Sequence, residues 1–168
     1  MKTIALSVIV LSLIFVGCSK RDASYYMQVA KQSVKQKNIP SAVTAYENLI
    51  KRYPDSPQAS QALFELASLY QNKIIKNITP KESLEKAVSL FQSIYDKYPD
   101  SKEAPKSLFM SGFILANDLN EYKRATSTFN LFLKKYPDNI LGLSAKEELK
   151  NMGLSPEKIL SDKTNSNL

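Results

Sequence analysis

The amino-acid sequence predicts an all-α protein built from repeated helical hairpins. Glycine is rare, with four among 168 residues, and the β-branched residues do not alternate with polar ones as they would in a half-buried strand. The eight prolines fall at breaks or first turns of the expected helices, where a missing N–H is tolerated. The tripeptide Tyr-Pro-Asp starts at Tyr53, Tyr98 and Tyr136. A chain that repeats one helix-ending signal is expected to repeat one structural unit.

The first expected hairpin comprises helices Ala23–Gln36 and Pro40–Tyr53. Proline at the start of the second helix fits its first turn, and the first Tyr-Pro-Asp ends it. The helices carry large, small and apolar residues at fixed positions before that signal. These positions are Tyr26, Val29 and Ala30 in the first helix, and Ala42, Tyr46 and Leu49 in the second.

The second expected hairpin comprises helices Pro57–Ile75 and Pro80–Tyr98. Thr79 and Glu82 flank Pro80 as a capping box, which marks the start of the second helix. The segment 71–79 lengthens this repeat, and it either extends both helices or forms a projecting loop. Ordinary length variation is favoured over a dedicated site as its explanation. The matching positions are Leu63, Leu66, Ala67 and Tyr70, then Ala87, Phe91 and Ile94.

The third expected hairpin comprises helices Lys102–Asn117 and Glu121–Tyr136, and a closing helix spans Ile140–Asn151. The solenoid is thus expected over residues 23–153, with a polar, peripheral tail at 154–168. Three repeats meet the minimum needed to bury a continuous core. The matching positions of the third hairpin are Leu108, Ser111, Gly112 and Leu115, then Ala125, Phe129 and Phe132.

These positions resemble the tetratricopeptide repeat, a hairpin of two helices that stacks into a solenoid. Small residues in both helices let the backbones approach, while the aromatics fill the space toward the next repeat. In this arrangement Tyr-Pro-Asp is the hinge between hairpins. Its tyrosine is expected in the core, and its aspartate, with the following Ser or Asn, is expected to cap the next helix.

Stacked hairpins of this kind curve, so their first helices are expected to line a concave groove. Phe64 and Phe109 occupy equivalent positions there, flanked by lysines and amides that suit an extended or helical peptide segment. The alternative is that each ring packs against a neighbouring helix. The expected groove residues are Met27, Lys31, Gln61, Phe64, Ser68, Lys106, Phe109 and Phe113.

The N-terminus predicts export and lipidation. Lys2 precedes an apolar run from Ile4 to Val16, which is too short to span a bilayer and reads as the core of a signal peptide at residues 1–17. Cys18 follows Gly17 and precedes a polar tether, 18–22. This resembles the bacterial lipoprotein signal, which implies acylation of Cys18, although Phe15 stands where that pattern usually has an aliphatic residue. A signal peptide with an incidental cysteine is the alternative.

Composition makes several classes of function unexpected. The chain has no histidine and one cysteine, which removes the commonest general base and the usual zinc and copper ligands. No glycine-rich phosphate loop is present, so we expect neither an enzyme nor a cofactor, a metal or a small-molecule substrate. The net charge of +7 comes from scattered lysines, which does not predict nucleic-acid binding. It fits solubility, or attraction to an anionic membrane surface or envelope polymer.

The three hinges resemble those of periplasmic tetratricopeptide lipoproteins. One type, BamD, supports the machine that inserts outer-membrane β-barrels; the other, CpoB, works with the Tol-Pal system at division. This chain is shorter than the first and lacks the N-terminal coiled coil of the second. The resemblance implies a lipid-anchored scaffold on the outer membrane that faces the periplasm and binds an envelope protein. Barrel assembly is the leading process, Tol-Pal-linked division is the alternative, and binding of peptidoglycan or anionic lipid is a hypothesis of another class.

Overall fold

A computed structural model describes residues 21–155, 157–159 and 161, and over these residues the chain is helical without a strand. The predicted all-α class is confirmed. The signal segment, Cys18 and the end of the polar tail lie outside the described residues. The elements are α1 (Ala23–Lys35), α2 (Ile39–Arg52), α3 (Ala59–Gln71), α4 (Pro80–Lys97), α5 (Ala104–Phe113), the π-helix η1 (Ile114–Asp118), α6 (Tyr122–Lys135) and α7 (Gly142–Asn151).

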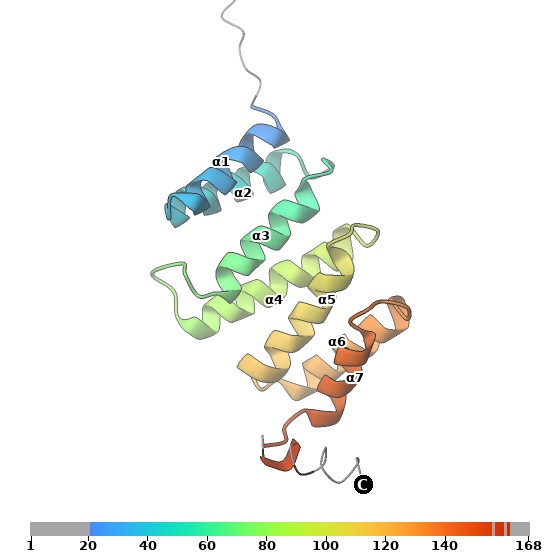
Figure 1. The fold of residues 1–168 in the computed structure, drawn as a ribbon. Coiled ribbons are helices and arrows are strands. Elements are labelled where there is room, and N and C mark those ends of the chain that lie inside the picture. Colours follow the sequence, from blue (N-terminus) through green and yellow to red (C-terminus); the bar gives the residue numbers. More distant parts are fainter. Residues whose placement is uncertain (1–20, 156, 160, 162–168) are drawn as a thin grey trace, which may run out of the picture.

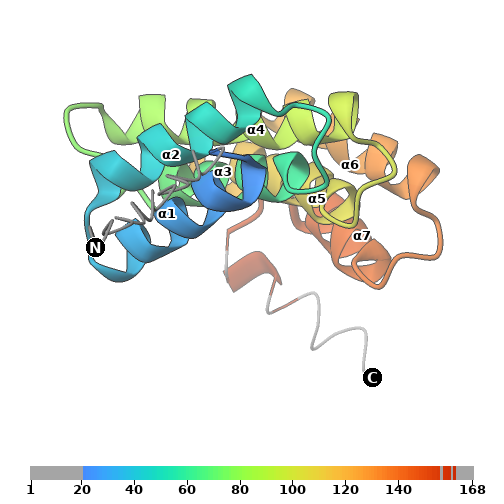
Figure 2. The same ribbon diagram turned by 90° about the horizontal axis from the view of Figure 1, so that it is seen from above.

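The helices stack as successive hairpins in two layers. One layer contains α1, α3, α5 and α7, and the other contains α2, α4 and α6 (Figure 1, Figure 2). Contacts run mainly between helices that are adjacent in sequence, which is the packing of a solenoid. The turns within hairpins lie along one edge and the hinges between hairpins along the other (Figure 1). We call these the turn edge and the hinge edge.

The predicted small and aromatic positions form the core. Ala30, Ala42, Ala67, Ala87 and Ala125 are completely buried, and so are the aromatic rings that follow them in the second helices. Burial at alanine lets neighbouring helices approach closely, because only a methyl group separates the backbones. The buried residues form two clusters, one from α1 to α3 and one from α3 to α7. Half-buried side chains such as Tyr70 and Leu90 pack against both clusters, so the core is continuous from α1 to α7.

Gly112 marks the tightest contact between α5 and α6. A β-carbon placed at Gly112 would lie 3.0 Å from the nearest ring atom of Phe129, which is closer than ordinary packing allows. Phe129 itself is completely buried. The glycine at this repeat position, where α1 and α3 carry alanine, therefore makes room for the ring.

The hinges are held by backbone hydrogen bonds rather than by aspartate caps. At the first hinge the N–H of Ser56 donates to the carbonyl of Tyr53 at 3.1 Å, and the N–H of Ala59 donates to the carbonyl of Ser56 at 3.0 Å. The other two hinges repeat this pattern. Helices α3, α5 and α7 begin without a side-chain cap. The prediction that the hinge aspartates cap these helices is therefore wrong, because two backbone bonds already close each turn.

Each hinge tyrosine ends one hairpin, and its hydroxyl is hydrogen-bonded to the backbone of the segment that precedes that hairpin. The hydroxyl of Tyr98 donates to the carbonyl of Pro54 at 2.8 Å, and that of Tyr136 donates to the carbonyl of Pro99 at 3.3 Å. The hydroxyl of Tyr53 donates to the carbonyl of Arg21. These bonds follow one another along the hinge edge, and we call them the hinge seam.

Replacing Tyr98 with phenylalanine should lower the free energy of unfolding by about 0.5–1.5 kcal/mol, the net value of one hydrogen bond. The ring keeps its packing in this variant, so the denaturant dependence should not change. Urea unfolding followed by circular dichroism measures the effect. Tyr95→Phe, in the last turn of the helix α4 that Tyr98 ends, is the matched control, and an equal loss in both variants would contradict a role for the seam.

The segment 71–79 is a loop rather than an extension of both helices. Helix α3 ends at Gln71, four residues before the predicted Ile75, because Lys73 adopts a left-handed conformation with φ 56°. Helix α4 begins at Pro80 as predicted, and the capping box is present: the N–H of Glu82 donates to the hydroxyl oxygen of Thr79 at 3.2 Å. Helix α4 has 18 residues, whereas α2 and α6 have 14 each, so α4 is itself about one turn longer than its counterparts.

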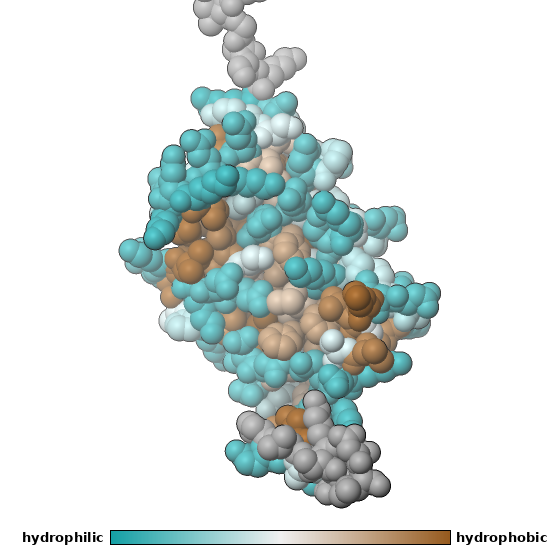
Figure 3. All heavy atoms as spheres, viewed as in Figure 1, coloured by the Kyte–Doolittle hydropathy of each residue, from teal (hydrophilic) through white to brown (hydrophobic). Residues whose placement is uncertain are grey.

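The surface is mostly hydrophilic, with a few apolar patches. One of them lies on the turn edge, at the left of the view, over the α1–α2 turn and the α3–α4 loop (Figure 3). None of the helices in the described part of the chain is both long and apolar enough to cross a bilayer.

Candidate functional site

The predicted groove residues all lie in the layer of first helices. Met27 and Lys31 are on α1, the middle group is on α3, and Lys106 and the last two rings are on α5. These helices lie side by side along the lower side of Figure 2. We call the side of α1, α3 and α5 that faces away from α2, α4 and α6 the first-helix face.

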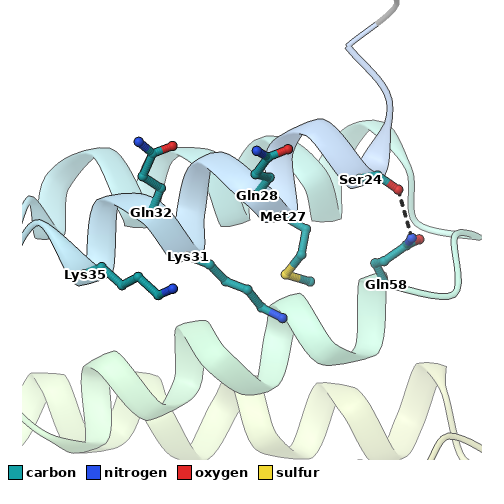
Figure 4. A pocket seen from close by; sticks show the side chains of 7 residues that line it. All are labelled: Ser24, Met27, Gln28, Lys31, Gln32, Lys35 and Gln58. Atoms are coloured by element: carbon teal, nitrogen blue, oxygen red, sulfur yellow. Dashed lines mark hydrogen bonds between the residues drawn. The ribbon is translucent and has the colours of Figure 1, made fainter.

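A hollow lies along α1 on this face, next to Gln58, the residue that precedes α3. Met27 and Lys31 line it, and the thioether of Met27 points into the space between the two helices (Figure 4). Gln58 donates a hydrogen bond from its Nε2 to the Oγ of Ser24 at 3.2 Å, which closes one end. Met27 is only 7% exposed. It is therefore the apolar floor of the hollow and not an exposed groove residue.

Sequence reasoning missed several residues of this hollow. Lys35 lies one helical turn after Lys31 on the same side of α1, so the spacing of the two lysines could have identified it. Gln58 could not be identified in that way, because it precedes α3 and reaches the hollow only through the hinge geometry. The missed lining residues are Ser24, Gln28, Gln32, Lys35 and Gln58.

The structure brings Phe64 and Lys106, two of the predicted groove residues, together. The ammonium nitrogen of Lys106 lies 5.1 Å from the centre of the Phe64 ring, which is the distance of a cation–π contact between α3 and α5. Phe64 is half-buried, and its ring meets Phe91 edge-on with centroids 5.4 Å apart. The hydroxyl of Ser68 donates to the carbonyl of Phe64 at 2.9 Å, so Ser68 is bonded within its own helix.

Phe109 does not line the face, although it is equivalent to Phe64. Its ring lies edge-on to Phe129 and Phe132, with centroids 5.6 and 5.8 Å away, and only 9% of the residue is exposed. The reason is in α6: Phe132 stands where α4 has Ile94, and the larger ring reaches Phe109. The placement of Phe109 in the groove is thus corrected, and the alternative of packing against a neighbouring helix holds.

The remaining predicted residues lie at intermediate depth. Phe113 is half-buried and stacks on Phe109 with centroids 6.5 Å apart, so one side of its ring stays accessible. Gln61 is also half-buried, while Lys31 and Lys106 are exposed. The face therefore offers two aromatic rings and several amides to a ligand.

Positive charge dominates the hollow and the surroundings of the Phe64 ring. Lys31 and Lys35 are the charged residues that line the hollow, and Lys106 covers Phe64. No group of three potential metal ligands occurs in the part of the chain that the structure describes. The chemistry on offer is apolar contact, amide hydrogen bonding and attraction to carboxylates.

Comparison with known proteins identifies the repeat. The family described as tetratricopeptide repeat matches residues 24–56, 61–101 and 106–139, which together make up more than half of the chain. Each match covers one hairpin with its hinge. Comparison with curated protein sequences gave no match. Tetratricopeptide repeats generally mediate binding of protein partners, and this solenoid of three repeats and a closing helix belongs to the tetratricopeptide repeat family.

Proposed function

We propose that the protein is a non-enzymatic scaffold that binds a segment of another envelope protein along its first-helix face. An acylated Cys18 holds it to the outer membrane, with the solenoid in the periplasm. Assembly of outer-membrane β-barrel proteins is the process we assign, on the resemblance of the hinges and the N-terminal pattern given above. Coordination of division with a Tol-Pal-type component is the alternative that the experiment below separates.

The observation that carries the binding proposal is the Phe64–Lys106 pair beside the lysine-lined hollow. A half-exposed ring takes an apolar side chain of a bound segment, and the ammonium groups take its carboxylates. The Phe64 ring lies on α3 and the hollow lies along α1, so one extended or helical segment can reach both. Charge on such a face mainly sets the rate of encounter and the choice of partner.

The position of the N-terminal end supports the anchor. Arg21 is bonded to Tyr53 through the hinge seam, so the chain leaves the solenoid at the hinge edge. The apolar run before Cys18 supports export by its length and position.

Photoreactive residues at Phe64 and Phe113 of the full chain, in membranes of the native host, should crosslink one envelope protein. Tyr25, an exposed aromatic on α1 that does not line the hollow, is the control position and should capture little of it. Lys106→Glu should reduce capture at Phe64 about tenfold, which corresponds to about 1.4 kcal/mol. Cys18→Ser should move the protein out of the membrane fraction.

The identity of the captured protein decides between the processes. A β-barrel assembly component supports the proposal, whereas a Tol-Pal or cell-wall synthesis component favours the division alternative. Equal capture at Phe64 and Tyr25 would refute binding at this face. Binding to isolated peptidoglycan or anionic vesicles that collapses at high salt, without protein capture, would indicate charge-driven attachment instead.

A further inference from the structure

A second hollow lies on the turn edge, between the α1–α2 turn and the α3–α4 loop. Its apolar wall is formed by Ile39 and Val43 from the start of α2 and by Ile74 and Ile75 from the loop. Lys37 and Lys76 stand on its rim. We call it the turn-edge hollow. It coincides with the apolar patch at the left of Figure 3.

The apolar side chains of this hollow are more than the hairpin turn needs. Ile74 is 42% exposed and Ile78, in the same loop, is 37% exposed. Both come from the segment that the second hairpin has in addition to the others, and the other two hairpins close their turns without it. Ile74 and Ile78 are not among the side chains that pack against the core, whereas Ile75 is. Exposed apolar side chains surrounded by a polar rim mark interaction sites.

The charged residues that line the hollow are both lysines, Lys37 and Lys76, and both are exposed. Every charged residue in the turn 35–40 and in the loop 72–79 is a lysine, namely Lys35, Lys37, Lys73 and Lys76. Lys73 is paired with Asp118 at 3.5 Å, which ties the base of the loop to η1. An occupant that complements this surface combines a bulky apolar side chain with carboxylates.

The shape and position of the hollow favour a protein segment over a bilayer. A bilayer is entered by protruding apolar side chains, whereas here α2 and the loop enclose a recess that accepts a side chain from outside. The chain also leaves the solenoid at the opposite edge, next to Tyr53. The 13 residues of α1 separate the two edges by about 20 Å.

We propose that the turn-edge hollow docks a segment of a partner protein by taking up a bulky apolar side chain flanked by aspartate or glutamate. The isoleucines of the loop contribute the contact area, and Lys37 and Lys76 select the acidic flanks. This surface is separate from the first-helix face, so it gives the scaffold a second contact on another edge. The inserted loop 72–79 is then a binding element and not a simple length variant.

The test uses the full chain in phosphatidylcholine nanodiscs with isotope-labelled isoleucine methyl groups. The probes are three synthetic peptides: a Leu-Phe pair flanked by Asp and Glu, the same pair flanked by lysines, and a Ser-Ser pair flanked by Asp and Glu. Only the first should shift the methyl signals of Ile39, Ile74 and Ile75. Ile94 and Ile114, which are completely buried, should not move.

A charge-reversal variant with its control, and an apolar-contact variant, examine the roles of charge and apolar contact. Combining Lys37→Glu with Lys76→Glu should weaken binding of the first peptide at least about tenfold, because it reverses the rim charge. Combining Lys134→Glu with Lys135→Glu on α6 makes the same charge change elsewhere and should leave binding within about twofold. Ile74→Ser should abolish the shifts while circular dichroism shows an unchanged fold, since this side chain is already exposed.

Three outcomes would overturn the proposal. One is no shift of the loop isoleucines with the acidic apolar peptide, and another is an equal shift with the lysine-flanked peptide. The third is broadening of the Ile74 signal by spin-labelled phosphatidylglycerol in the nanodisc, which would show that the loop contacts lipid. None of these results bears on crosslinking at Phe64, so the two proposals fail separately.

Discussion

Phe129→Ala should lower the free energy of unfolding by about 3–5 kcal/mol, the usual cost of removing a buried phenylalanine ring. Phe129 is completely buried, lies against Phe109, and covers Gly112. Loss of the ring removes one of the two aromatic contacts between α6 and Phe109 on α5. Urea unfolding of the full chain gives the value, and a loss below about 1 kcal/mol would mean that the surrounding side chains refill the space.

Gly112→Ala provides the complementary change at the same contact. In the parent chain the added methyl group meets the Phe129 ring at 3.0 Å, so the overpacked core should lose about 1–3 kcal/mol. In the Phe129→Ala background that clash is absent, and alanine should instead stabilise α5 by about 1 kcal/mol through its helix propensity. The two substitutions should therefore be strongly non-additive, and additive effects would contradict the contact.

The protein should lose stability at alkaline pH because of its buried tyrosines. Burial, together with a smaller effect of the Glu65 charge, raises the pKa of Tyr46 from 10.0 to about 12. Burial also raises the pKa of Tyr70, Tyr98 and Tyr136. The folded chain thus holds these protons more tightly than the unfolded chain, in which a tyrosine ionises near pH 10.

The sign of the effect follows from that difference. The stabilisation is fully present below pH 10 and is lost as the pH rises toward the folded-state value near 12. For Tyr46 alone the loss is on the order of 2–3 kcal/mol at pH 12. Urea midpoints between pH 9 and pH 12 measure it. Tyr46→Phe should flatten the decline, while Tyr25→Phe, which removes an exposed hydroxyl, should not; equal slopes in both would refute the assignment.

The sequence was sufficient for the repeat and for most helix positions, because these depend on local signals. Proline at the start of α4 and the capping box at Thr79 placed that helix correctly. The end of α3 was less predictable, because Lys73 adopts a left-handed conformation that usually needs glycine or asparagine. The π-helix η1 left no signal in the pattern either; it occupies the end of the predicted Lys102–Asn117 helix.

The groove was predicted less well than the fold, since exposure depends on the neighbouring repeat. Equivalent positions gave one half-exposed ring, Phe64, and one buried ring, Phe109. The difference arises from Phe132 on α6, whose size matters only once the packing is known. The turn-edge hollow was missed for a related reason: Ile39 and Ile74 are far apart in sequence, and only the stacking of the first two hairpins brings them together.

The hinge seam also determines how the solenoid can bend. Its hydrogen bonds tie successive segments along the hinge edge, from Arg21 through Pro54 to Pro99. On the turn edge the hairpins are tied by partly exposed ion pairs, Lys73 with Asp118 and Arg124 with Glu85, and such pairs are weak. We therefore expect the hinge edge to change its length less than the turn edge when the solenoid bends. Bending should then mainly open and close the turn edge.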